Sequence, residues 1–155
     1  MGKLLQFLVI HCTDTPEGRE VSSDEIRRWH TSPVSKGGRG WKQVGYTDMI
    51  HLDGEVERLV DNNEDATVDS WEITNGAAGY NAISRHIVYV GGRAKGSKTP
   101  KDTRTAEQLR VMKAYVTSFH RRFPNVKIIG HNEISAKACP SFDVQDWLKS
   151  IGVNQ

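Results

Sequence analysis

The sequence predicts an α/β fold in which helices cover a mixed β-sheet. Three short apolar runs, at residues 4–12, 86–90 and 126–130, are typical of strands buried inside a sheet. Amphipathic periodicity after Ser23 and after Thr105 predicts helices between these strands. Strands that alternate with helices along a chain favour a sheet with helices packed on it.

Each element of the first half has its own local signal. The strand at 4–12 ends in a polar turn. Ser23 stands before two acidic residues, and a hydroxyl followed by negative charge is typical of a helix start. The Gly-rich residues 32–40 predict a loop. Asp53-Gly54 then predicts a hairpin between two strands, at 44–52 and 55–60.

The second half continues the alternation. Residues 61–80 are polar and predict a surface loop before the strand at 86–90. A helix begins at Thr105, keeps its apolar side chains on one face and stops at Pro124, because proline cannot continue a helix. We expect the strand at 126–130 and a short helix at 143–151 to complete the fold.

Composition and charge exclude several classes of protein. The 155 residues, 37% hydrophobic and 26% charged, fit one domain spanning 1–155. The longest apolar run, residues 7–10, is far shorter than the ~20 residues of a membrane span. Lys plus Arg number 21 and Asp plus Glu 19, so we expect no nucleic-acid partner. The N-terminal run lacks a cleavage site, so we interpret it as a strand and not as a signal peptide.

His11, His131 and Cys139 are the candidate metal ligands. His11 ends the first predicted strand and His131 follows the strand at 126–130, so neighbouring parallel strands would bring both to one edge of the sheet. The loop between His131 and Cys139 is long enough to return the cysteine to them. Two imidazoles and a thiolate hold zinc with one position open for water, the pattern of a catalytic site. Spacing alone leaves open the alternative of hydrogen-bonded structural histidines and a buried cysteine.

Short motifs in a fixed order carry a resemblance to a known family. They are Val-Ile-His-Cys-Thr at 9–13, Val-Gly-Tyr at 44–46, Gly-Tyr-Asn at 79–81, Val-Gly-Gly at 90–92, and Gly-His-Asn-Glu at 130–133 with Lys-Ala-Cys-Pro-Ser-Phe-Asp at 137–143. With them the chain resembles the zinc-dependent N-acetylmuramoyl-L-alanine amidases of the T7 lysozyme-like group, whose fold the peptidoglycan recognition proteins share. The resemblance extends over about residues 4–151, and residues 131–143 are its most specific part.

The resemblance implies a site, a cofactor and a reaction. It implies Zn²⁺ held by His11, His131 and Cys139, with Tyr46 and Lys137 as the catalytic residues. It also implies a twisted, mainly parallel sheet of five or six strands with helices on both faces. The substrate would be peptidoglycan, cut at the amide between N-acetylmuramic acid and the L-alanine of the stem peptide. Chemically, a cation such as Lys137 can stabilise the charge that develops on the amide oxygen, and Tyr46 can orient the water or shuttle its proton.

The chain departs from the family pattern at three places around the expected groove. Thr47-Asp48 follows the tyrosine, Thr74-Asn75-Gly76 replaces a motif that ends in histidine, and Ser84-Arg85-His86 replaces Ser-Ile-Gly. We therefore expect Asp48, Arg85 and His86 to reshape the substrate cleft, with Arg85 pairing with a peptide carboxylate. The alternative is that Arg85 is a surface charge.

We expect no catalytic or metal-binding role for the remaining histidines or for the second cysteine. We expect Cys12 to be a buried free thiol, because its side chain points to the opposite face from its neighbour His11. His30 is expected to be structural or to line the groove. His51 and His120 are expected to be surface or half-buried residues.

Two other function classes stand beside the amidase. One is a non-catalytic module that binds peptidoglycan, although such relatives commonly lack the cysteine ligand that Cys139 supplies. The other is regulation of a partner protein, known in the T7 lysozyme-like group, for which the chain has no marker. We expect a monomer, made in the cytoplasm without a signal peptide and acting on the cell wall or periplasm after release, as a phage or prophage endolysin does (in the host cytoplasm if phage-encoded).

Overall fold

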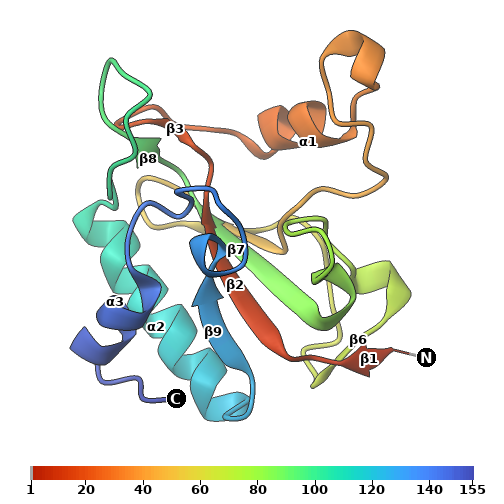
Figure 1. Ribbon diagram of the computed structural model, residues 1–155, viewed down its shortest axis with the longest axis vertical. Helices are drawn as coiled ribbons and strands as arrows, with labels where there is room; N and C mark the ends of the chain where they lie inside the picture. The colour runs from red at the N-terminus through yellow and green to blue at the C-terminus, as the bar shows by residue number, and fades with distance from the viewer. Residues whose placement is uncertain (1) are drawn as a thin grey trace.

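The computed structural model describes residues 2–155, and a five-stranded sheet forms its centre (Figure 1). The strand order is β5-β4-β7-β2-β9. Three of the four pairings are parallel, β4 with β7, β7 with β2, and β2 with β9, whereas β4 and β5 are antiparallel. The strands are β2 (Phe7–Cys12), β4 (Asp48–Ile50), β5 (Val56–Arg58), β7 (Ser84–Tyr89) and β9 (Lys127–Gly130). The predicted mixed, mainly parallel sheet is confirmed.

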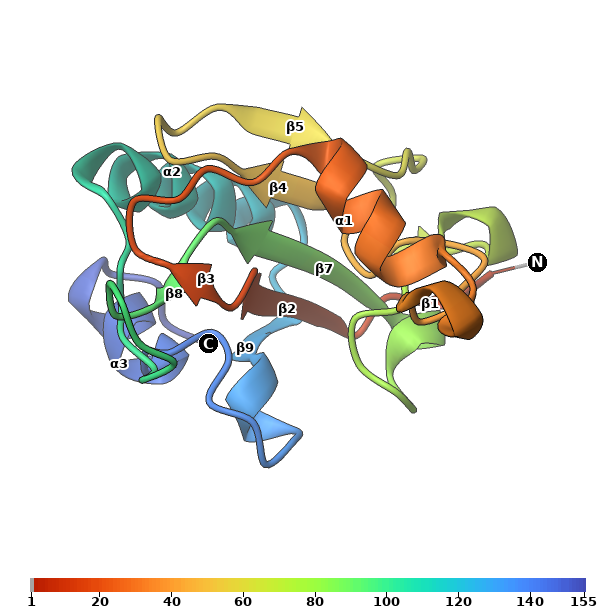
Figure 2. The same cartoon turned by 90° about the horizontal axis from the view of Figure 1, so that it is seen from above.

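Helices cover both faces of this sheet. They are α1 (Ser23–Thr31), α2 (Ala106–Arg122) and α3 (Val144–Ser150). Ile87 of β7 packs in one apolar layer with Met112 of α2 and Leu148 of α3, whereas Val88 packs in another with Ile26 of α1. Because successive side chains of a strand point to opposite faces, α2 and α3 cover one face and α1 the other (Figure 2).

Local capping explains where the helices begin. Ser22, one residue before the predicted start, caps α1 in a reciprocal pair of hydrogen bonds with Glu25. Thr105 and Gln108 form the same arrangement at α2. The predicted helices and the hairpin at Asp53-Gly54 are confirmed, but the hairpin strands β4 and β5 have only three residues each, so the predicted strands at 44–52 and 55–60 were too long.

Two short accessory pairs extend the fold beyond the central sheet. β1 (Lys3–Leu4) pairs with β6 (Thr67–Val68), so the first predicted strand is divided and the predicted loop at 61–80 contains a strand. β3 (Thr15–Pro16) pairs with β8 (Gly92–Arg93) beyond the carboxyl ends of β2 and β7. Single turns of 3₁₀ helix occur at η1 (Val34–Lys36), η2 (Ser70–Glu72), η3 (Asn81–Ile83) and η4 (His131–Glu133).

Candidate active site

The carboxyl ends of β2 and β9 bring two histidines together. Ile10 lies opposite Gly130 in the parallel pairing, so the next residues, His11 in β2 and His131 just after β9, lie side by side. Their ring centroids are 4.6 Å apart. His11 is 1% exposed, whereas His131, at the start of η4, is half-buried. The structure thus has the juxtaposition expected from the positions of both histidines at strand ends.

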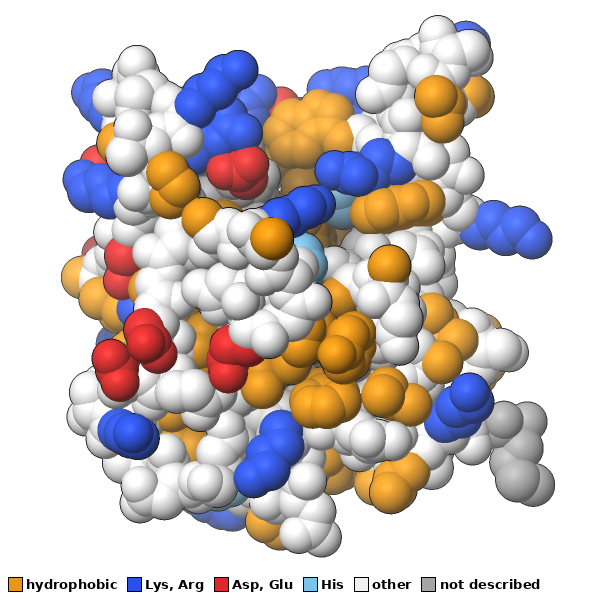
Figure 3. Space-filling model, viewed as in Figure 1, with side chains coloured by type: hydrophobic (Ala, Val, Ile, Leu, Met, Phe, Trp, Pro, Cys, Tyr) orange, Lys and Arg blue, Asp and Glu red, His pale blue; other side chains and the backbone are white. Residues whose placement is uncertain are grey.

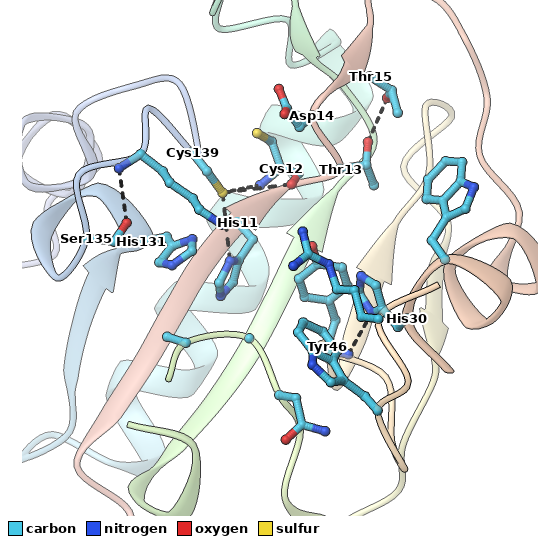
Figure 4. Close-up of a pocket in the computed structure, with 18 of the residues that line it drawn as sticks. His11, Cys12, Thr13, Asp14, Thr15, His30, Tyr46, His131, Ser135 and Cys139 are labelled. Carbon is cyan, nitrogen blue, oxygen red and sulfur yellow. Dashed lines mark hydrogen bonds between the residues drawn. The ribbon is translucent and has the colours of Figure 1, made fainter. Parts of the chain in front are cut away.

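Cys139 completes the cluster from the loop that follows η4. The backbone N–H of Cys12 donates a hydrogen bond to Sγ of Cys139 at 3.2 Å, which holds the loop against the end of β2. Sγ of Cys139 lies 3.8 Å from Nδ1 of His11. One ligand atom from each of His11, His131 and Cys139 lies within 4.8 Å of the others, and the three could hold a metal ion (Figure 4).

The protonation of these residues suits metal binding. Burial lowers the pKa of His11 well below its ordinary value, and the neighbouring histidines lower it further. Burial and the charge of Lys137 also lower the pKa of His131. Both rings are therefore neutral at physiological pH, as a metal ligand must be. The adjacent Cys12 thiol and burial raise the pKa of Cys139 in the metal-free chain, so its thiolate requires a compensating cation.

The three side chains lie at the base of a cleft of about 760 Å³, within the size range of small-molecule sites. Figure 3 shows histidine atoms deep in a hollow that is bordered by lysine and arginine side chains. Four cationic residues line it, namely Arg19, Arg39, Arg93 and Lys137. Arg93 pairs with Asp14 at 2.7 Å and Arg19 with Glu25 at 2.7 Å, whereas Arg39 stacks on the ring of Trp41.

Tyr46 and Lys137, the two expected catalytic residues, both line this cleft. The ring centroid of Tyr46 is 5.2 Å from that of His11. Burial raises the pKa of the Tyr46 phenol far above its ordinary value, so the phenol keeps its proton and is able to donate a hydrogen bond. Lys137 is exposed and lies two residues before Cys139. Its positive charge contributes to the lowered pKa of both His11 and His131.

His30 has a structural part in the wall of the cleft. The backbone N–H of Gly45 donates to its Nδ1 at 2.9 Å, and its ring packs against those of Trp41 and Tyr46. Burial and the charge of Arg39 lower its pKa to about 4. The neutral ring therefore supports the segment that carries Tyr46, in line with the expectation of a structural, groove-lining residue.

Two expected specificity residues do not reach the cleft. Arg85 is buried and donates to the carbonyl oxygens of Asp65 and Thr67, so it holds the polar 61–80 segment against the sheet and is unavailable to a peptide carboxylate. The alternative of a surface charge is also wrong. Asp48 is buried on the α2 side, where it accepts hydrogen bonds from Arg58 and Tyr115.

His86 does not line the cleft either, but it touches the candidate metal site from below. Its Nδ1 lies 2.8 Å from Nε2 of His11. The sequence singled out His86 only as a departure from the family pattern, because a contact between residues on two strands depends on the pairing register.

Cys12 is a buried free thiol as expected, and within the described residues Cys139 is also unpaired.

The other two histidines lie away from the cleft. His51 is half-buried between Glu20 and Glu57. His120 is half-buried on α2. Both positions agree with the sequence expectation.

Comparison with known proteins places the chain in a family. The family model described as N-acetylmuramoyl-L-alanine amidase matches residues 2–142. The endolysin of Enterobacteria phage K11 is 34% identical over 146 residues, which cover 94% of this chain and 85% of that protein. The endolysin of Escherichia phage T7 is 30% identical over 140 residues, covering 90% and 83%.

Solved structures share the fold at lower identity. The Ph2119 endolysin from a Thermus scotoductus bacteriophage superimposes with a TM-score of 0.71 at 22% identity, covering 99% of this chain and 88% of that one. Drosophila PGRP-LB gives a TM-score of 0.69 at 18% identity, covering 99% and 85%. In residues 2–155 no helix has the length and apolar character to cross a membrane. The chain belongs to the N-acetylmuramoyl-L-alanine amidase family and is similar to phage endolysins.

Proposed function

We propose that the chain is a zinc-dependent amidase that cleaves the bond between N-acetylmuramic acid and the L-alanine of the stem peptide. His11, His131 and Cys139 would hold the zinc, and Tyr46 and Lys137 would act on the substrate. The convergence of three ligand atoms of the right chemistry at the base of the cleft carries this proposal.

The donor set fits zinc. Zinc–nitrogen and zinc–sulfur bonds of about 2.1 and 2.3 Å in a tetrahedral ion place the two ligand atoms about 3.6 Å apart. Sγ of Cys139 and Nδ1 of His11 are separated by 3.8 Å. Nitrogen and sulfur donors favour zinc over magnesium or calcium, and three protein ligands leave a position for water or substrate.

Bound there, zinc would polarise the amide carbonyl and lower the pKa of a water molecule enough to make it a nucleophile near neutral pH. The chain's own residues supply charge stabilisation and orientation of the reacting groups. The Lys137 ammonium would stabilise negative charge on the amide oxygen as the tetrahedral transition state forms. The protonated Tyr46 phenol would donate a hydrogen bond that orients the reacting group, and its packing against His11 and His30 limits its movement.

The cleft and the family suggest which substrate the enzyme cleaves and where it acts. Positively charged side chains around the cleft suit the carboxylates of a peptidoglycan stem peptide. Relatives named endolysins favour action on the cell wall after release from the cell that makes the protein. The fold is shared with a peptidoglycan recognition protein, so the fold alone does not separate an enzyme from the alternative, a non-catalytic binding module. The thiol of Cys139 among the candidate ligands favours the enzyme.

The chain's two cysteines provide a matched test. Cys139→Ala should lose tightly bound zinc and amidase activity, whereas Cys12→Ala should keep one zinc per chain, because the hydrogen bonds between Cys12 and Sγ of Cys139 use the backbone N–H and C=O of Cys12, which the substitution keeps. Metal content after dialysis and the release of soluble fragments from purified peptidoglycan measure the two effects. Equal zinc content in both variants would contradict the assigned ligands.

A further inference from the structure

Two hydrogen bonds, one buried and one partly buried, link His11 to a polar group below the cleft. Nε2 of His11 lies 2.8 Å from Nδ1 of His86, and Nε2 of His86 lies 3.0 Å from Oδ1 of Asn81. His86 is completely buried. The parallel pairing places Val9 opposite His86, so His11 and His86 project from the same face of neighbouring strands, two positions apart along the sheet.

The backbone sets the direction of these hydrogen bonds. The N–H of Ala77 donates to Oδ1 of Asn81 at 2.9 Å, which identifies the atom that faces His86 as the amide oxygen. An oxygen opposite Nε2 of His86 requires that this nitrogen carry the proton. Nδ1 of a neutral His86 is then an acceptor, and Nε2 of His11 must be the donor. Nδ1 of His11 is left without a proton, and this is the atom 3.8 Å from Sγ of Cys139.

We propose that His86 and Asn81 are positioning residues that hold His11 in the tautomer and orientation required for metal binding. The proposal rests on the proposed function, since it takes His11 as a zinc ligand. The opposite tautomer of His86 would donate from Nδ1 to His11 and put the His11 proton on Nδ1, where it would block the metal. The oxygen of Asn81 disfavours this tautomer. If Nδ1 of His86 carried the proton, its Nε2 would be an acceptor facing the Asn81 oxygen, and two acceptors cannot form a hydrogen bond.

Gly76 makes room for this arrangement. A Cβ atom at position 76 would lie 2.5 Å from Nδ1 and 2.6 Å from Cγ of His86. The His86 ring thus fills the space that a side chain at 76 would need. Gly76 and His86 are therefore sterically coupled, because the lack of a side chain at 76 leaves room for the ring that gives His11 a hydrogen-bond acceptor from the sheet.

A histidine that binds a metal generally donates its other ring N–H to an acceptor, and loss of that acceptor typically weakens metal affinity 10–100-fold. His86→Leu removes the acceptor but fills much of the space. Asn81 gives a matched pair that does not touch His11. Asn81→Asp keeps an oxygen facing both Ala77 and His86, whereas Asn81→Leu removes it.

Two measurements on the full chain test the proposal. Long-range ¹H–¹⁵N spectra of the histidine rings in the zinc-free protein identify the tautomer of His11 without using zinc. Competition with a chromophoric chelator gives the zinc affinity of each variant, and urea denaturation of the zinc-free forms separates affinity from folding. Rescue by Asn81→Asp distinguishes a positioning role from simple core filling.

We expect His11 protonated at Nε2 in the zinc-free wild type. We expect zinc affinity about 10–100-fold weaker in His86→Leu, clearly weakened in Asn81→Leu, and within about threefold of wild type in Asn81→Asp. A His11 protonated at Nδ1, or folded His86→Leu with wild-type zinc affinity, would overturn the proposal while leaving the zinc site intact. A wild-type chain that binds no zinc would overturn the proposed function and, with it, this role.

Discussion

Gly76→Ala is the substitution whose effect can be worked out most directly from the structure. The added methyl would lie 2.5 Å from Nδ1 of His86 and 2.8 Å from the carbonyl oxygen of Gly45, where ordinary contact begins near 3.4 Å. The His86 ring cannot swing aside without breaking its bonds to His11 and Asn81. Overpacking of this kind costs about 1–3 kcal/mol, and alanine returns about 0.4–1 kcal/mol by restricting the unfolded chain. We expect a net loss of about 1–2 kcal/mol.

Urea denaturation of the zinc-free protein measures this loss, with Gly45→Ala as the control. A methyl at position 45 meets its nearest atom, Cε1 of His30, at 3.1 Å, so it should cost less. Both variants share the unfolded-state gain, so their difference in stability reports how much more severe the contact at position 76 is than the contact at position 45. In a His86→Ala background the cost of Gly76→Ala should shrink, as expected for residues in contact. Equal stability of Gly76→Ala and Gly45→Ala, with equal zinc affinity, would refute the coupling of Gly76 and His86.

Three further predictions concern the loop that carries Cys139, the proposed catalytic residue Lys137, and pH. Tyr89→Phe removes a buried 2.6 Å hydrogen bond to the carbonyl of Pro140, so we expect a stability loss of about 1–3 kcal/mol in urea denaturation and weaker zinc binding through the adjacent Cys139. Lys137→Ala should keep its zinc but hydrolyse peptidoglycan about 10²–10³-fold more slowly; an unchanged kcat would remove Lys137 from the mechanism. Burial opposes the charging of His51, but Glu20 and Glu57 raise its pKa above the ordinary value. The stabilisation it provides is complete below about pH 6.5 and is lost as pH rises through the raised folded-state pKa. His51→Gln should therefore lower the free energy of unfolding by up to about 1 kcal/mol at pH 6 and by less at pH 8.5, and an effect that grew with pH would contradict this assignment.

The sequence was sufficient for the parts of the fold that depend on local pattern. Apolar runs, capping residues and one Asp-Gly pair predict the strands, helices and hairpin, because each signal lies within a few residues of the element it specifies. The meeting of His11 and His131 could also be predicted, since parallel strands end at the same edge of a sheet. The length of the loop allowed Cys139 to return to them, and the resemblance to the amidase family assigned it as the third ligand.

The contacts of β7 could not be predicted in the same way. Residues 84–86 lie inside the strand, and only the alternation of its side chains decides that Arg85 points away from the cleft while His86 lies beneath His11. A register shifted by one residue would exchange the two faces. Arg85 was therefore wrongly assigned to the substrate, and the role of His86 became visible only with the neighbouring strands in place.

The most direct test of the proposed function is the release of L-alanine amino termini from purified peptidoglycan. The protein should be assayed as purified, after removal of metal by a chelator, and after zinc is restored. We expect release that is lost with the chelator and recovered with zinc. Release that continues unchanged in protein shown to be free of metal would contradict the zinc site formed by His11, His131 and Cys139. No release by the zinc-loaded protein would contradict the amidase assignment itself.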